Sequence, residues 1–89
     1  MQEKESPTRL RILSILDAAQ QEMFGRDIIK ASEQSPGLRL QLGVIYVDLN
    51  RMEEDRLVSS REMPLEPGLS LPRRKYSITS AGRFELHRK

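Results

Sequence analysis

Apolar residues recur at helical spacing near the start of the chain. They are Leu10, Ile12, Leu13, Ile15 and Leu16. Residues three and four positions apart lie on one face of a helix, so this pattern is typical of an amphipathic helix with one buried side. Ser6 and Pro7, just ahead of it, are favourable residue types for a helix start. The pattern therefore predicts a first helix that runs through about residue 20.

A short second helix is expected after a break in this pattern at residues 23–25. Asp27 leads it, Ile28 and its apolar neighbours supply a buried side, and the Ser35-Pro36-Gly37 segment ends it, since Pro and Gly together stop a helix. Residues 39–42 then alternate between polar and apolar types, which indicates a short strand.

A third helix and a hairpin follow. The helix is expected over residues 43–55, and its core-facing positions are Ile45, Leu49 and Met52. Residues 57–62 read as a strand. Residues 75–79 alternate as a second strand, with Tyr76 and Ile78 inward. Between them, residues 63–72 contain three Pro and one Gly and are expected to form a loop.

A final helix is predicted at the end of the chain. Thr79 or Ser80 is a suitable N-cap, and the helix would place Phe84 and Leu86 near the core. The order of elements predicts an α+β, mostly α fold: a winged helix-turn-helix with a three-helix core, a two-stranded wing and a short C-terminal helix. We expect this domain over residues 8–89, after a flexible N-terminal segment of residues 1–7.

Composition narrows the classes of function. The 89 residues contain no Cys, and the single His lies near the end of the chain, at position 87. Without a glycine-rich phosphate loop or spaced metal ligands, an enzyme, a metal site and a bound cofactor are not expected. No apolar run approaches the roughly 20 residues that span a bilayer, and residues 1–9 do not read as a signal peptide. A cytoplasmic protein without a membrane partner is the expectation.

The net charge of +2 conceals an uneven distribution. Residues 73–89 carry six Lys or Arg and one Glu, a net charge of +5, whereas residues 1–72 carry nine Lys or Arg and twelve Asp or Glu, a net charge of −3. The basic end could bind a polyanion, or it could be a solvated tail.

Several separated motifs resemble those of the PadR family of bacterial transcriptional regulators. They are residues 12–16 of the first helix, the Met23-Phe24-Gly25-Arg26-Asp27-Ile28 segment, Gly43-Val44-Ile45-Tyr46 followed by Leu49, Arg51, Met52 and Glu53, and residues 72–79 with Gly82. Their order along the chain matches the family's first helix, second helix, recognition helix and second wing strand. The resemblance covers residues 10–86 and implies a regulator that binds duplex DNA.

The chain also departs from the family pattern. Arg26 stands where the family has an aromatic residue. Arg56 stands where the family ends its recognition helix with Gly, and a left-handed backbone there would cost a non-glycine residue about 1 kcal/mol. Family members continue into a long C-terminal helix that builds the dimer and, in some, an effector pocket. Here only about three turns of that helix are expected, so the chain reads as a short form for which no effector is predicted.

The resemblance and the fold together predict a sequence-specific transcriptional repressor that binds double-stranded DNA as a homodimer. In a helix-turn-helix protein the second helix of the motif enters the major groove. The predicted contacts from helix 43–55 and its approach are Gln41, Val44, Tyr46, Val47, Asn50 and Arg51. Amide side chains pair with adenine, Arg with guanine, and Val with a thymine methyl group. Tyr46 could equally be a packing residue, and Arg51 could instead be held by Glu54 or Asp55.

The wing is predicted to supply phosphate contacts through Arg73, Arg74 and Lys75. Strand alternation gives Arg73 and Lys75 a shared outward face and puts Arg74 on the other. A different function also fits a winged helix, because a fold does not determine what it binds. The loop 63–72 carries the apolar residues Met63, Leu65, Leu69 and Leu71, so a protein-interaction module that docks through this loop is the alternative.

Overall fold

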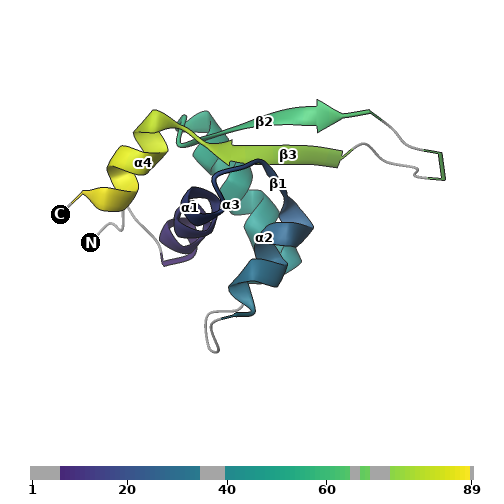
Figure 1. Cartoon of the computed structure of the whole chain (residues 1–89), viewed down its shortest axis with the longest axis horizontal. Coiled ribbons are helices and arrows are strands. Elements are labelled where there is room, and N and C mark those ends of the chain that lie inside the picture. The colour runs from purple at the N-terminus through teal and green to yellow at the C-terminus, as the bar shows by residue number, and fades with distance from the viewer. Residues whose placement is uncertain (1–6, 35–39, 65–66, 69–72, 89) are drawn as a thin grey trace.

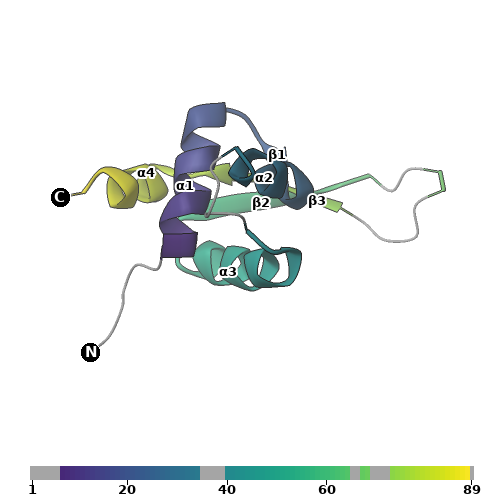
Figure 2. The same ribbon diagram turned by 90° about the horizontal axis from the view of Figure 1, so that it is seen from below.

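The computed structural model describes residues 7–34, 40–64, 67–68 and 73–88. The helices within these residues are α1 (Pro7–Ala19), α2 (Gly25–Ser32), α3 (Leu42–Glu54) and α4 (Ser80–His87). The strands are β1 (Met23–Phe24), β2 (Val58–Met63) and β3 (Arg73–Ile78), and they form one antiparallel sheet in the order β1-β3-β2. Along the molecule, α4 lies at one end and the hairpin of β2 and β3 extends at the other, with the remaining helices between them (Figure 1, Figure 2).

The hydrophobic core lies between the buried faces of α1, α2 and α3 and the sheet. Its most deeply buried side chains are Ile12, Leu13, Leu16, Ile28, Ile45, Leu49, Met52, Val58 and Tyr76. The predicted buried faces of the first and third helices are therefore confirmed, as is the inward position of Tyr76. Each helix has one apolar stripe, and packing the three stripes together removes them from water.

The strand predicted over residues 39–42 is wrong. Arg39 lies outside the described residues, Gln41 is the N-cap of α3, and α3 begins at Leu42. The Leu40 side chain is buried, and its backbone N–H donates to the Ser32 hydroxyl oxygen at 3.1 Å. Because a side chain satisfies this amide, Leu40 needs no partner strand.

The third strand of the sheet comes instead from Met23 and Phe24. They pair with Tyr76 and Lys75, respectively, on the side of β3 away from β2. The sequence pattern had shown this segment only as a break between two helices. Two residues are too short to produce a recognisable alternation, so only the pairing with β3 reveals the strand.

The hairpin is longer than predicted. Its strands reach Met63 and Arg73, which are partners in the register, so Met63 belongs to β2 and not to the loop. Side chains alternate between two faces of the hairpin. Arg74, Tyr76 and Ile78 share the face that packs on the helices, whereas Arg73, Lys75 and Ser77 share the other. The apolar loop residues Leu65, Leu69 and Leu71 lie outside the described residues, as do residues 1–6 of the segment predicted to be flexible.

Two helix ends show how local chemistry sets the elements. Thr79 is the N-cap of α4, as predicted, and its hydroxyl oxygen accepts the Gly82 N–H at 2.9 Å. At the end of α3, Arg56 has a φ of 66°, while its N–H donates to the Glu53 carbonyl and the Leu57 N–H donates to the Met52 carbonyl. This pair of bonds is a Schellman motif, and Arg56 therefore has the left-handed backbone whose cost for a non-glycine residue was considered above.

The prediction for α4 is half correct. Leu86 packs against the core, whereas Phe84 is 71% exposed and contacts solvent. Gly82 is the residue that brings α4 close to the sheet, because a Cβ atom there would lie 2.2 Å from the Leu57 carbonyl oxygen and 2.8 Å from Ile78 Cγ1. The rotation that places Gly82 and Leu86 inward turns Phe84 outward, since 3.6 residues make one turn.

Candidate nucleic-acid interface

The outer face of α3 is rich in exposed apolar surface. Val44, Tyr46 and Val47 are 48%, 40% and 53% exposed. Val47 lies opposite the buried positions of the helix, and Val44 and Tyr46 lie on either side of it. The other predicted contacts from this region, Gln41, Asn50 and Arg51, are also exposed. A Cβ atom at Gly43 would meet nothing within 4 Å, so the first turn presents open backbone. The structure thus brings all six predicted α3 residues to the surface.

Tyr46 is both a packing residue and a surface residue. Its ring lies over the first residue of α2, because a Cβ atom at Gly25 would be 2.5 Å from the Tyr46 hydroxyl oxygen. The contact leaves the ring 40% exposed. The two alternatives left open by the sequence therefore do not exclude each other: Tyr46 joins α3 to α2 and still offers its hydroxyl group to a partner.

The three wing cations divide between the two faces, as strand alternation predicted. The Arg73 guanidinium lies 3.9 Å from the centroid of the Phe24 ring, and the Lys75 ammonium lies 5.1 Å from it. Both distances are typical of cation–π contacts. On the opposite face, Arg74 Nε donates to the Ser60 hydroxyl oxygen at 3.1 Å, and its Nη1 lies 3.5 Å from Glu62 Oε1. Arg74 is the wing cation on the side of α3.

A chain of hydrogen bonds connects this face of the wing to α3. The Ser60 hydroxyl group accepts from Arg74 and donates to Glu53 Oε2 at 2.8 Å. Glu53 is thereby held against the hairpin, on the side of α3 away from the exposed valines. The wing and the helix are positioned as one unit, so a ligand that contacts both meets little independent motion.

Arg26 is a site residue that the sequence analysis missed. It lies exposed in the first turn of α2 and lines a cavity of about 280 Å³ between α2, α3 and β3. We call this the arginine cavity; its lining residues are Phe24, Arg26, Tyr46, Arg73, Arg74 and Tyr76. Arg26 had been noted only as a departure from the family pattern. Its position at the start of the first helix of a helix-turn-helix, which crosses the DNA backbone, is the signal that could have identified it.

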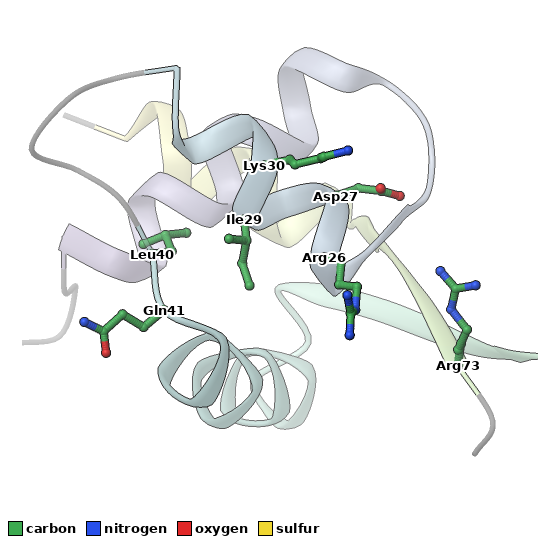
Figure 3. A pocket seen from close by; sticks show the side chains of 7 residues that line it. All are labelled: Arg26, Asp27, Ile29, Lys30, Leu40, Gln41 and Arg73. Atoms are coloured by element: carbon green, nitrogen blue, oxygen red, sulfur yellow. The ribbon is translucent and has the colours of Figure 1, made fainter. Parts of the chain in front are cut away.

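A larger open groove adjoins the arginine cavity and shares two of its residues. We call it the α2–α3 groove; it measures about 750 Å³ and is lined by Arg26, Asp27, Ile29, Lys30, Leu40, Gln41 and Arg73. Figure 3 shows Arg26 reaching from α2 and Arg73 from β3 near one end of the groove, with Gln41 near the other. Arg26 and Arg73 thus place two cations at the wing end of the groove.

Elsewhere on the described surface, several cations are paired with carboxylates. Arg61 donates to both carboxylate oxygens of Glu22 at 2.8 and 2.9 Å, which lowers the pKa of Glu22. Arg83 and His87 bind Asp17 at 3.1 and 3.3 Å, and the hydrogen bond from Arg83 is the main cause of the lowered pKa of Asp17. The first pair connects β2 to the segment after α1, and the pairs with Asp17 connect α4 to α1.

Arg51 behaves differently from these paired arginines. The alternative in which Glu54 or Asp55 holds it is wrong, since Asp55 pairs with Arg9 at 2.6 Å, and within the described residues Arg51 makes no ion pair. Among those same residues Arg26 and Arg73 also form no ion pair with a carboxylate. Three guanidinium groups without a described carboxylate partner therefore lie on α2, α3 and β3, although Arg11 on α1 and Arg56 after α3 also form no ion pair among the described residues.

The described part of the chain offers neither a metal site nor a membrane span. No group of three or more His, Asp or Glu side chains there is arranged to hold a metal ion. None of the described helices is long and apolar enough to cross a membrane.

The fold is similar to solved structures of transcriptional regulators. A PadR family transcription regulator from Clostridium difficile R20291 matches with a TM-score of 0.75 and 27% identity over 91% of this chain and 80% of that one. A putative transcriptional regulator from Thermoplasma acidophilum matches with a TM-score of 0.73 and 27% identity over 92% and 75% of the two chains. The predicted winged helix-turn-helix fold is confirmed by these matches.

The fold is also that of Bacillus subtilis PadR, solved in complex with operator DNA. That match has a TM-score of 0.75 and 23% identity, and it covers 89% of this chain but only 44% of the Bacillus protein. No curated protein matches the sequence. The model of the transcriptional regulator PadR-like family matches residues 12–88, which is most of the chain and includes every described element except the first turn of α1. The chain belongs to the PadR-like family of transcriptional regulators.

Proposed function

We propose that this chain represses transcription by binding duplex DNA in a sequence-specific manner, with α3 in the major groove and the wing along the phosphate backbone. The observation that carries the proposal is the position of the unneutralised cations. Arg26 on α2, Arg51 on α3 and Arg73 on β3 form no ion pair with a described carboxylate, whereas Arg9, Arg61, Arg83 and Arg88 of α1, β2 and α4 do. Membership of a family of transcriptional regulators supports it, and so does the operator complex of a protein with the same fold.

The exposed residues of α3 suit base edges more than phosphates. Val44 and Val47 lie three positions apart and offer apolar contact to thymine methyl groups, while Asn50 offers an amide to adenine and Arg51 a guanidinium to guanine. Gln41, the N-cap of α3, lies where the helix would enter the groove. At the other end of α3, Glu53 is held by Ser60 and Asp55 by Arg9, so we expect the N-terminal half to approach DNA.

A homodimer follows from the way helix-turn-helix proteins read DNA. Two copies related by a twofold axis place their recognition helices one helical turn apart, which matches a palindromic operator. The contact would have to use the N-terminal segment, α4 or the wing. Phe84 on α4 is exposed and apolar, which makes α4 the part of the described surface best suited to it.

The test is fluorescence anisotropy with the duplex from upstream of the chain's own gene. A scrambled duplex and the Arg73→Ala, Arg74→Ala, Lys75→Ala triple variant run beside it across a salt series. A matched control replaces Arg9, Arg11 and Arg56, which removes the same charge from α1 and the end of α3, away from the proposed interface and from α4. Tighter binding of the native duplex, with a salt slope that is shallower by about 2 to 3 in the wing variant alone, is the expected result.

Two results would count against this function. Equal affinity for native and scrambled duplexes would remove the sequence-specific regulator. Equal losses in the wing variant and the control triple would show that overall charge, and not the wing, carries binding. A reporter gene placed behind the bound duplex then tests repression, which requires that expression fall when the wild-type chain is present and recover with the wing variant.

A further inference from the structure

The arginine cavity contains more positive charge than the protein itself neutralises. Its three guanidinium groups come from Arg26 on α2 and from Arg73 and Arg74 on β3. Among the described residues, the one carboxylate that forms an ion pair with them is Glu62, 3.5 Å from Arg74, and both side chains of this pair are about half accessible. An exposed pair of this kind contributes little net energy and can rearrange. Asp27 lines the adjoining α2–α3 groove, and Glu53 binds the Ser60 hydroxyl group that holds Arg74. The cavity therefore has more guanidinium groups than carboxylates paired with them.

The guanidinium groups are held in place by neighbours that do not compete for their charge. The Arg73 guanidinium stacks on the Phe24 ring, with its central carbon 3.9 Å from the ring centroid. The Ser60 hydroxyl group, which donates to Glu53, accepts a hydrogen bond from Arg74 Nε. Stacking leaves the edge of a guanidinium available, so its N–H groups can still bind an anion in the ring plane. A guanidinium group that is already held in position loses less side-chain entropy on binding than one that moves freely in solvent.

The rest of the wall suits an anion as well. Tyr46 reaches the cavity across Gly25 and can donate its hydroxyl proton. Burial is the main cause of the raised pKa of Tyr76, so this second phenol keeps its proton at neutral pH and does not repel a negative ligand. A volume of about 280 Å³ admits a tetrahedral oxyanion with several waters, given that liquid water occupies about 30 Å³ per molecule.

The position of the cavity selects its ligand. It lies between the first helix of the helix-turn-helix motif, the recognition helix and the wing, which is where a DNA strand would pass on leaving the major groove. We propose that Arg26, Arg73 and Arg74 together bind one backbone phosphate of the duplex, with Phe24 as the positioning residue for Arg73. This inference rests on the proposed function, and it adds α2 to an interface otherwise made of α3 and the wing.

The experiment compares Arg26→Ala, Arg26→Lys and Phe24→Leu with the wild type in the same anisotropy assay. Arg56→Ala is the matched control, because it removes one exposed arginine from the opposite end of α3. Thermal unfolding of each variant checks that the fold is kept. Arg26→Ala should bind native and scrambled duplexes about tenfold more weakly and lower the salt slope by about 0.9, since one phosphate contact is lost. Arg26→Lys should restore the salt slope but not the full affinity, because lysine keeps the positive charge but cannot form the two parallel hydrogen bonds of a guanidinium group.

Phe24→Leu distinguishes positioning from simple loss of charge. The substitution keeps every cation and an apolar side chain, yet it removes the stacking surface under Arg73. We expect weaker binding of every duplex with the fold intact. Wild-type affinity in this variant would show that Phe24 has no role in positioning Arg73.

A second arm identifies the source of the phosphate. Inorganic phosphate is titrated into the ¹⁵N-labelled protein while the arginine Nε–H signals are followed, with and without DNA. Shifts of the Arg26 and Arg73 signals that DNA reproduces at far lower concentration support a backbone phosphate. Saturation by inorganic phosphate without any loss of DNA affinity would overturn the proposal and identify a small-anion site.

The outcomes also separate this inference from the function on which it rests. If the wild type binds its native duplex specifically while Arg26→Ala and Arg56→Ala behave alike, the arginine cavity is not a phosphate site and the regulator remains. If the wild type binds no duplex, the proposed function fails, and the inference fails with it.

Discussion

The left-handed residue at the end of α3 provides a quantitative test of the backbone reasoning. Arg56 has a φ of 66°, a conformation in which the Cβ atom of an L-residue crowds the following carbonyl oxygen. Its N–H donates to the Glu53 carbonyl at 3.0 Å, and its own carbonyl accepts the Thr79 hydroxyl at 2.7 Å. Both bonds involve only the backbone atoms of Arg56, and not its side chain. The substitution Arg56→Gly would retain them and relieve the crowding.

The expected gain follows from two opposing terms. A left-handed conformation costs an L-residue about 1–2 kcal/mol, which glycine does not pay. Glycine loses more backbone conformational entropy on folding than other residues, which reduces the gain by about 0.5–1 kcal/mol. The net stabilisation lies between about 0 and about 1.5 kcal/mol. Its midpoint of about 0.75 kcal/mol should raise the melting temperature of a domain of this size by about 3–6 °C.

Urea unfolding at one fixed protein concentration measures the effect, because the stability of the proposed dimer would depend on concentration. Arg56→Ala is the essential control: it removes the same guanidinium and its interaction with the helix end but keeps the Cβ atom. We expect the glycine variant to exceed the alanine variant by about 1 kcal/mol in free energy of unfolding. Gln20, with a φ of 55° at the end of α1, allows the same pair of substitutions with a different side chain.

The result that would refute the reasoning is a glycine variant no more stable than the alanine variant at position 56. It would mean that the observed φ carries no steric cost, or that the unfolded-state term outweighs it. DNA affinity should be unchanged in both variants, since Arg56 lies at the end of α3 away from the exposed valines.

Three further predictions concern the rest of the molecule. Gly82→Ala should lower the free energy of unfolding by about 1–3 kcal/mol or more in a thermal melt, because its Cβ would collide with the Leu57 carbonyl oxygen at 2.2 Å; unchanged stability would contradict the close packing of α4. Phe84→Ser should leave the monomer's stability within about 0.5 kcal/mol but shift the sedimentation of a dimer toward monomer, and an unchanged mass would exclude Phe84 from the dimer contact. The lowered pKa values of Asp17 and Glu22 contribute stability that is present above their ordinary values of 3.8 and 4.5 and lost as pH falls through the lower folded-state values. Urea unfolding from neutral pH down to pH about 3 should show this loss of stability. The Glu22→Gln variant should lose less stability than the wild type. Equal losses in the wild type and the variant would contradict a role for the Glu22–Arg61 pair.

Much of the fold was predictable because its signals are local. The stripes of α1 and α3 depend on residues three and four positions apart, and the alternation of β3 on residues two apart, so both can be read from a short window. The Thr79 cap and the left-handed backbone at Arg56 are likewise decided by a few adjacent residues. The candidate contacts on α3 followed from the same periodicity, since positions opposite a buried stripe are exposed.

The tertiary structure decided what depends on distant parts of the chain. Phe24 is a strand residue because β3 lies beside it, and Leu40 is a core residue because Ser32 satisfies its amide. The outward turn of Phe84 depends on how closely Gly82 lets α4 approach the sheet. Arg26 is 47 positions from Arg73, and no sequence window contains both. The amino-acid sequence alone determined which segments are helices and strands and which faces they bury, because those preferences act between near neighbours. Where the unpaired cations meet was decided by packing, because only packing brings α2, α3 and the wing to one place.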